Sequence, residues 1–517
     1  MRDGGKGYDP ATAFLITALC AASAALLLLV DGAKGDEDEF PTLLINGFTA
    51  THAAGSPSPF EPVLYAPNRA FAFGFLRVGP GSLDLAVVHL PSSLPLWRAT
   101  PARLGDWSRP ATLSFDTTLV LTTAGGPDTT VLWQTLNAAG DTVALLNSSN
   151  LVVRRYARPF PSWQSFDYPA DTLVAGQNFT AASPPLISSN RRFALRLGAS
   201  FIALHMEFYG GRARSPAYWR HSALEEPPAA GNATVYGRLD GRGFFGMYLD
   251  GDGGERRVDV LSFDTFAEAN LAGALFRRMT LDDDGNLRAY YWADGGGGST
   301  KAWTAEYEAI SSGRCGLPTA CGAYGLCVPG DEAQCQCLTA DTTSPPCHAG
   351  GDDEETAADL CDHVDAELDV VRRTRVSVAY KEQLPPFATN TTAAKCEAAC
   401  AGNCSCWGAL YGGASGYCYL IDFPVETMVY DADDAKVGYF KVRKVQSQTR
   451  RRGMAPGVKA VLAVVLVGLV GAGAYVGYRM WERKRRRRGE GMMVQELGTG
   501  PYKDLKSMAS SNNSFKA

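Results

Sequence analysis

The sequence predicts a mainly β, multidomain chain with one transmembrane helix. Residues 40–180 contain short stretches in which apolar and polar residues alternate, and clusters of Gly, Pro and Asn separate these stretches. Of the 13 cysteines, 12 lie between Cys315 and Cys418, whereas residues 36–314 contain none. An even cysteine set packed into one region predicts disulfide-rich modules. The 19-residue apolar run at 460–478 is long enough to cross a bilayer as a helix.

Composition and charge exclude one broad class of function. The 517 residues carry a net charge of -5, with 46% hydrophobic and 20% charged residues, as in an ordinary globular protein. Residues 441–517 hold 17 Lys and Arg against 4 Asp and Glu, whereas residues 1–440 hold 32 against 50. An acidic body therefore precedes a basic tail, which excludes a nucleic-acid-binding protein of the uniformly basic type.

The N-terminal segment predicts entry into the secretory pathway. Residues 11–30 are uncharged and apolar, and Ala33 and Gly35 flank Lys34 in a pattern that suits signal peptidase. We expect a signal peptide at 1–35 that is cleaved, with an uncleaved membrane anchor as the alternative. Secretion would also supply the oxidising compartment that disulfides need.

The apolar run near the C-terminus predicts a transmembrane helix at 459–478. Arg479 and the basic cluster at 483–488 follow it, so the positive-inside rule places the C-terminus in the cytosol. We expect a single-pass type I protein of the plasma membrane, with its N-terminal ectodomain outside and its helix in contact with membrane lipid. Gly473 and Gly477 have the GxxxG spacing that lets two helices approach closely, which permits a homodimer.

Two segments of the β-rich region carry a family resemblance. The sequence WQSFDYPADTL at 163–173, preceded by the strand-like LLNSSNLVV at 145–153, resembles the end of the bulb-type, mannose-binding-like lectin domain of plant S-locus glycoproteins and S-domain receptor-like kinases. MTLDDDGNLRAYYW at 279–292 is similar to the S-locus glycoprotein region of the same family. The resemblance runs from about residue 40 to residue 445. It implies a bulb-lectin β-prism, a second β region, an EGF-like module and an α+β PAN/apple domain.

The resemblance and the two apolar segments together divide the chain into eight parts. We expect a signal peptide (1–35), a bulb-type lectin-like domain (36–182), an S-locus glycoprotein-like β region (183–310), an EGF-like module (311–350), a PAN/apple domain (351–445), a juxtamembrane linker (446–458), a transmembrane helix (459–478) and a basic, Ser-rich cytosolic tail (479–517).

The cysteines form two groups of six, and spacing alone leaves 15 pairings open for the first group. The family resemblance implies these bridges: Cys315–Cys327, Cys321–Cys335, Cys337–Cys347, Cys396–Cys418, Cys400–Cys406 and, as the remaining pair, Cys361–Cys404. A zinc site formed by CxC pairs with His348 or His363 is the alternative.

Five Asn-X-Ser/Thr sequons predict N-linked glycans on the outer side. They lie at Asn147, Asn178, Asn232, Asn390 and Asn403. We expect the least occupancy at Asn147, beside a predicted strand, and at Asn403, between closely spaced cysteines.

The sugar-binding pattern of bulb-type lectins, QxDxNxVxY, is degenerate in this chain. Around Asp116 only the Asp and Val120 match, and around Asn150 only the Asn and Val152 match. The stretch at 282–290 keeps three of the five positions. Loss of the Gln and Tyr removes hydrogen bonds on which recognition of a hydroxyl-rich ligand depends. We therefore interpret these positions as remnants that are retained for strand packing.

Sequence motifs give no indication of catalysis. The chain has no HExxH, GxSxG or Walker loop, and the Asp-rich turn at 282–285 lacks the final Glu of a calcium loop. Residues 479–517 are too few for a kinase domain and contain no kinase motif. We expect the protein not to be an enzyme and to hold no cofactor or metal.

The favoured hypothesis is a kinase-less receptor-like glycoprotein that binds an extracellular protein or glycan and acts with a separate receptor kinase. The alternative is a membrane-tethered lectin for mannose-type or cell-wall glycans.

Overall fold

The computed structural model describes residues 41–99, 103–125, 128–136, 138–208, 215–223, 234–241, 243–250, 254–262, 276–293, 301–330, 334–337, 361, 368–443 and 456–492. These residues belong to two units, which divide at residue 444 and are considered separately. The predicted signal peptide, the linker up to residue 455, Asn232, Cys347, His348, His363 and the tail beyond residue 492 lie outside the described residues.

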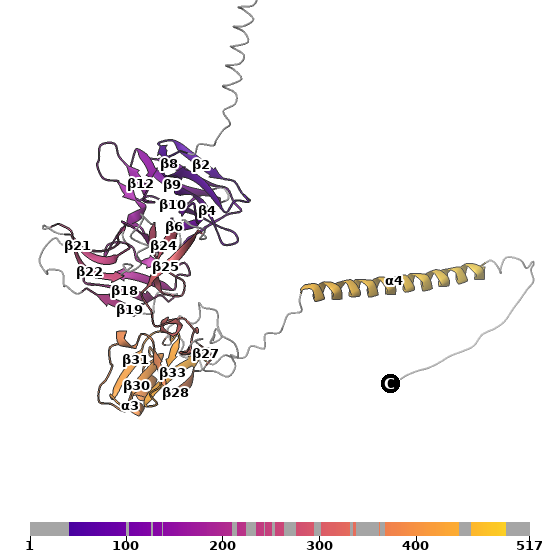
Figure 1. Cartoon of the computed structure of the whole chain (residues 1–517). Coiled ribbons are helices and arrows are strands. Elements are labelled where there is room, and N and C mark those ends of the chain that lie inside the picture. The colour runs from indigo at the N-terminus through magenta and orange to yellow at the C-terminus, as the bar shows by residue number, and fades with distance from the viewer. Residues whose placement is uncertain are drawn as a thin grey trace, which may run out of the picture. The chain divides into compact units, whose positions relative to one another are not determined.

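The first unit begins with three antiparallel sheets that surround one apolar core, and we call this part the first prism (Figure 1). The sheets have the orders β1-β11-β12-β13, β10-β9-β8-β2 and β3-β4-β5-β6, and β7 adds to β5. The strands are β1 (Leu43–Ile45), β2 (Phe48–His52), β3 (Phe60–Tyr65), β4 (Phe71–Val78), β5 (Ser82–His89), β6 (Leu94–Arg98), β7 (Gly105–Asp106), β8 (Ala111–Asp116), β9 (Thr118–Gly125), β10 (Asp128–Gln134), β11 (Thr142–Leu145), β12 (Leu151–Arg154) and β13 (Trp163–Gln164).

Alternation of apolar and polar residues explains how these strands form the core. Leu113 and Phe115 of β8 are fully buried, as are Leu119 and Leu121 of β9. Thr117 is exposed and has a φ of 66°, because the chain reverses direction there between β8 and β9.

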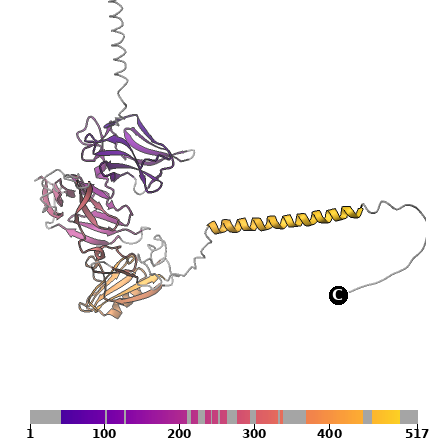
Figure 2. The same ribbon diagram turned by 45° about the vertical axis from the view of Figure 1, so that its right-hand side comes forward.

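Twelve further strands form a second prism with the same plan (Figures 1 and 2). Its sheets have the orders β14-β23-β24-β25, β15-β20-β21-β22 and β16-β17-β18-β19. The strands are β14 (Thr172–Val174), β15 (Asn178–Thr180), β16 (Leu186–Ile187), β17 (Phe193–Leu197), β18 (Phe201–Met206), β19 (Ala217–Ser222), β20 (Thr234–Leu239), β21 (Phe245–Asp250), β22 (Arg256–Ser262), β23 (Arg277–Leu281), β24 (Leu287–Ala293) and β25 (Ala302–Glu308). A 3-10 turn, η1 (Ser165–Asp167), precedes β14.

The two prisms repeat each other down to single hydrogen bonds. In the first prism, the backbone N–H of Asn68 donates to Oδ1 of Asn147 at 2.9 Å. In the second, the N–H of Asn190 donates to Oδ1 of Asp283 at 2.8 Å. Since the strand orders also correspond one to one, the S-locus-like region is a second copy of the lectin-like fold. The second copy begins at β14, inside the range that the sequence assigned to the lectin-like domain.

Aromatic side chains join the two prisms. Phe276, which precedes β23, contacts Phe71 of the first prism with ring centroids 5.0 Å apart, and it stacks on His89 at 5.3 Å. Trp292 of β24 meets the same histidine edge-on at 5.2 Å. Buried aromatic pairs of this kind contribute beyond the area that they remove from water, so the junction is a packed interface.

The cysteine-rich part of the unit combines two sheets with one helix. The sheets have the orders β27-β26-β32-β29 and β28-β33-β30-β31. The elements are η4 (Arg314–Gly316), β26 (Gly325–Val328), β27 (Gln334–Cys337), β28 (Leu368–Thr374), β29 (Val376–Val378), η5 (Lys381–Gln383), α3 (Ala393–Ala401), β30 (Gly408–Gly412), β31 (Tyr417–Ile421), β32 (Met428–Tyr430) and β33 (Lys436–Arg443). Helix α3 follows Thr392, whose hydroxyl accepts from the N–H of Lys395.

Five disulfides join described cysteines in this part of the chain. They are Cys315–Cys327, Cys321–Cys335, Cys361–Cys404, Cys396–Cys418 and Cys400–Cys406. Cys337 is also disulfide-bonded. Cys396 and Cys400 both lie buried in α3, one helical turn apart, so two bridges attach the helix to its surroundings.

The predicted EGF-like and PAN/apple modules share one sheet. β26 pairs in parallel with β32, with Leu326 opposite Met428. The hydroxyl of Tyr324 donates to the carbonyl of Lys441 at 2.8 Å, and the N–H of Cys321 donates to Thr427 at 2.8 Å. A single apolar core cluster extends from the second prism through both modules. These parts are therefore continuous, rather than separate domains on linkers.

The described part of the second unit is the helix α4 (Pro456–Met492), which holds the run predicted to span the membrane (Figure 1). Among the described residues, no helix is both long enough and apolar enough to cross a membrane.

Candidate functional site

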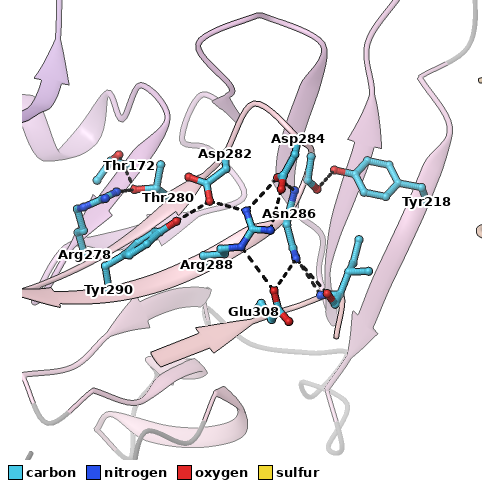
Figure 3. Close-up of polar contacts among 12 residues, drawn as sticks. Thr172, Tyr218, Arg278, Thr280, Asp282, Asp284, Asn286, Arg288, Tyr290 and Glu308 are labelled. Carbon is cyan, nitrogen blue, oxygen red and sulfur yellow. Dashed lines mark hydrogen bonds and ion pairs between the residues drawn. The ribbon is translucent and has the colours of Figure 1, made fainter. Parts of the chain in front are cut away.

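The candidate site lies at the turn between β23 and β24 of the second prism, where three of the five sugar-pattern positions are retained (Figure 3). Gly285 has a φ of +87° at this turn, and a Cβ there would lie 2.9 Å from the ring of Phe193. Only glycine fits both demands. The hydroxyl of Tyr218 donates to the carbonyl of Gly285 at 2.5 Å, which fixes the turn from β19.

Three carboxylates converge on Arg288 of β24 (Figure 3). Its Nη1 lies 2.7 Å from Oδ2 of Asp282, and its Nη2 lies 2.7 Å from Oδ2 of Asp284. Its Nε lies 3.5 Å from Oε2 of Glu308, which is directly opposite on β25. Burial lowers the pKa of Arg288, but its hydrogen bonds to Asp284 and Asp282 outweigh that effect and raise the pKa above its usual value.

The retained pattern residues are engaged in contacts within the protein. Tyr290 donates to Oδ2 of Asp282 at 2.7 Å, and burial together with this bond raises the pKa of Tyr290 to about 12. Asn286 is 1% exposed, and its amide bonds both the N–H and the C=O of Ile310 at 3.0 Å. Arg288 stands where the pattern places the Val that packs against sugar. The turn therefore presents an internal ion-pair network rather than a mannose site.

The other predicted remnants are not brought together. Asp116 and Val120 lie in the sheet that contains β8 and β9, whereas Asn150 and Val152 flank or lie in β12 of a different sheet. Asp116 is exposed and Val120 is half-buried, while Val152 is 1% exposed. Nδ2 of Asn150 donates to Oε1 of Gln164 at 2.9 Å. The side chain of Asn150 is thus hydrogen-bonded within the first prism, as that of Asn286 is within the second.

Sequence reasoning missed several residues of this site, among them Arg278. Its guanidinium lies 4.1 Å from the ring centroid of Tyr290 and 4.8 Å from that of Trp303, and it donates to Thr280 (Figure 3). Burial lowers the pKa of Arg278. In the sequence, Arg278 and Tyr290 are 12 positions apart across a hairpin. That spacing indicates a contact only when the register of β23 and β24, which places the two residues opposite each other, is known.

An open cavity of about 560 Å³ adjoins the network. Asp284, Arg288 and Glu308 line it on the prism side, and Arg314 and Leu317 line it on the side of the cysteine-rich module. Charges of both signs face this space, which suits a polar ligand. Within the part of the chain that the structure describes, no group of three His, Cys, Asp or Glu could hold a metal ion.

A half-buried carboxyl near the network, that of Asp171, gives a prediction about pH. Asp171 accepts from Thr172 at 2.9 Å and from Ser189 at 3.1 Å, and burial raises its pKa. Because the pKa of Asp171 is higher in the folded than in the unfolded protein, the folded protein loses stability as the pH rises from the ordinary carboxyl pKa through the raised native pKa. We expect Asp171→Asn to raise the melting temperature at about pH 8 and to have little effect at about pH 4. Asp116→Asn, at an exposed carboxyl, is the control, and an Asp171 variant that melted below the native protein at pH 8 would contradict the prediction.

The sequons give a second prediction. Asn147, Asn178, Asn390 and Asn403 are all exposed. Oδ1 of Asn403 accepts from both the N–H and the hydroxyl of Ser405, the hydroxyl residue of its own sequon, and Oδ1 of Asn147 accepts from the N–H of Asn68. We expect glycopeptide mass spectrometry to find lower occupancy at these two sites than at Asn178 and Asn390, because folding of each turn competes with modification. Equal occupancy at all four would contradict this.

Comparison with known proteins agrees with the fold. The D-mannose binding lectin family matches residues 98–185, and the S-locus glycoprotein domain family matches residues 262–341. A PAN domain-containing protein of Arabidopsis thaliana is 39% identical over 471 residues, which are 90% of this chain and 90% of that protein. A G-type lectin S-receptor-like serine/threonine-protein kinase of the same plant is 28% identical over 54% of this chain and 32% of the kinase. A putative receptor protein kinase of Zea mays is 24% identical over 73% of this chain and 46% of the kinase.

The matched regions are lectin-type and binding-type domains rather than catalytic ones, and the kinases match over less than half of their own length. The relative that is matched almost from end to end is the PAN domain-containing protein. The chain therefore belongs to the plant S-domain, or G-type lectin, family of receptor-like proteins.

Proposed function

We propose that this protein is a kinase-less, receptor-like cell-surface glycoprotein that binds an extracellular ligand or a partner receptor and modulates its signalling. The observation that carries the proposal is the Arg288 network. It fills the best-retained sugar pattern with the protein's own charges, while the prism scaffold around it is intact. A lectin-type scaffold whose best-retained sugar pattern is occupied by its own side chains is suited to recognition through other faces.

Membrane attachment is part of this proposal. The apolar run at 460–478, the basic cluster after it and the receptor-like relatives support a single-pass type I protein of the plasma membrane. Among the described residues outside the helix's own backbone, none places an atom within 4 Å of where a Cβ would stand at Gly473 or Gly477, which leaves room there for a second helix. A receptor kinase or a second copy of this chain is the proposed membrane partner.

Co-purification from native membranes tests the proposal. The full-length chain would be compared with a chain stopped after Arg488 and with a full-length Gly473→Leu, Gly477→Leu variant. Recovery of a receptor kinase that falls on truncation places the contact in the tail, and recovery that falls only in the glycine variant places it in the helix. Absence of any kinase from all three preparations would overturn the co-receptor assignment.

The second candidate is a membrane-tethered lectin for mannose-type or cell-wall glycans, which the match to the D-mannose binding lectin family favours. Calorimetric titration of the full-length chain with mannose separates the two. The co-receptor proposal expects no measurable heat, because Arg288 and Asn286 are already bonded within the protein. Saturable heat that Arg288→Ala changes would support the lectin instead.

A further inference from the structure

Residues 154–162 of the first prism, which run from the last residue of β12 to the residue before β13, combine exposed cations with exposed aromatic rings. We call this segment the basic–aromatic loop. The side chains of Tyr156 and Phe160 are 81% and 78% exposed, which is unusual for rings of this size in a folded protein. Arg154 and Arg158 are exposed as well, and their guanidinium groups have no hydrogen-bond or ion-pair partner among the described residues.

The backbone of this loop is held in place even though its side chains are exposed. The carboxylate of Asp141 accepts from the N–H of Tyr156 at 2.9 Å, and Nε of Arg155 donates to the carbonyl of Ala139 at 2.7 Å. The N–H of Arg158 closes a turn onto Arg155 at 3.1 Å. A loop that is ordered before binding loses less entropy when a ligand arrives. The exposed rings are therefore presented by a fixed support.

An open cavity of about 890 Å³ lies beside the loop. Arg155, Arg158 and Phe160 line one part of it, and Thr118 and Ser162 bring hydroxyl groups. This volume lies within the range of ligand sites, which is roughly 300–1,000 Å³. The cavity thus offers guanidinium donors, hydroxyls and an aromatic face to a single ligand.

Charge identifies the class of that ligand. Three arginines lie within five residues, near the carboxylate of Asp141, on a chain whose first 440 residues carry 32 basic and 50 acidic residues. Unpartnered guanidinium groups select carboxylates, which they bind through two parallel hydrogen bonds. Exposed rings beside hydroxyl groups suit the alternating apolar and polar surface of a sugar. The loop also lies in the segment that matches a carbohydrate-binding family.

We propose that the basic–aromatic loop and its cavity bind an acidic, carboxylate-bearing oligosaccharide. The arginines pair with the carboxylates and the two rings stack on sugar faces. This site is separate from the Arg288 turn of the second prism. Two of its residues, Thr118 and Arg154, stand at degenerate positions of the QxDxNxVxY pattern, those of the Asn and the Tyr. The site rests on the proposed recognition function only in requiring that the ectodomain meets an extracellular ligand.

Binding to the full-length chain in detergent tests the proposal, with an oligogalacturonate as the probe and its methyl ester as the uncharged form. We expect the native chain to bind the acid and not the ester. Arg158→Gln and Tyr156→Ala should each weaken binding about tenfold, in line with loss of one charge-assisted bond or one stacking contact. The controls Arg373→Gln and Phe387→Ala remove an exposed arginine and an exposed ring elsewhere and should leave the dissociation constant unchanged.

Three results would overturn the proposal. The acid could fail to bind the native chain, it could bind all variants equally, or poly-glutamate could bind as tightly as the oligosaccharide with the same sensitivity to Arg158→Gln, which would make the ligand an acidic peptide. Recovery of a receptor kinase with the same variants is measured in parallel. Kinase recovery without oligosaccharide binding refutes this inference and leaves the proposed function standing, whereas binding without any kinase refutes the co-receptor and retains the site.

Discussion

Asn286→Ala is expected to lower the free energy of unfolding by about 3 kcal/mol, because it leaves two buried backbone groups unpaired at roughly 1–3 kcal/mol each. The amide of Asn286 bonds both the N–H and the C=O of Ile310 at 3.0 Å. Both residues are buried, with 1% and 8% of their surfaces exposed. Urea unfolding followed by tryptophan fluorescence measures the change as a lower denaturation midpoint.

The same variant separates a structural asparagine from a sugar ligand. A ligand residue could be removed with little loss of stability, whereas a residue that ties β24 to the segment after β25 could not. Asp116→Ala is the matched control, since Asp116 belongs to another degenerate copy of the pattern, is exposed and should change stability by less than about 0.5 kcal/mol. An Asn286 variant as stable as that control would contradict the structural role.

The sequence predicted the β class well because burial in these strands follows strict alternation, as in β8 with Ala111, Leu113 and Phe115 inward. It did not reveal that the second β region repeats the first. The signal existed in two short pairs of segments, PNRAFA at 67–72 with SNRRFA at 189–194, and NSSNL at 147–151 with DDGNL at 283–287. Repeated folds retain the residues that shape turns, while strand residues change as long as they remain apolar.

The Arg288 network could not be read from the sequence, because it depends on strand register. The pattern shows Arg288 only as a residue that replaces Val. Asp282 and Asp284 come from the adjoining turn, but Glu308 meets Arg288 only because β24 and β25 pair at that position. The sheet that the two cysteine-rich modules share could not be predicted for the same reason, since its paired residues Leu326 and Met428 are far apart in the sequence. Local patterns do not report pairings of this kind.

Phe423→Ala should have the largest effect, about 4 kcal/mol, because truncation of a buried Phe costs roughly 3–5 kcal/mol. Phe423 is 1% exposed and stacks on Phe208, which follows β18 of the second prism, with ring centroids 6.1 Å apart. On its other side it contacts Tyr380, at 5.7 Å. Arg192 and Glu426 add an ion pair at 2.8 Å across the same junction. Phe423 thus belongs both to the PAN/apple part and to the core that this part shares with the prism.

Because the core is shared, the loss of stability in Phe423→Ala should extend beyond the PAN/apple part. Differential scanning calorimetry of the full-length chain should show the transitions of the second prism and the cysteine-rich modules moving down together. Phe387→Ala, which removes an equally large ring that is 60% exposed, should leave both unchanged. If only the transition of the cysteine-rich modules moved in Phe423→Ala, the two parts would be separate folding units. If both move, a ligand bound at either part stabilises the other, since binding to one face of a cooperative unit stabilises the whole unit.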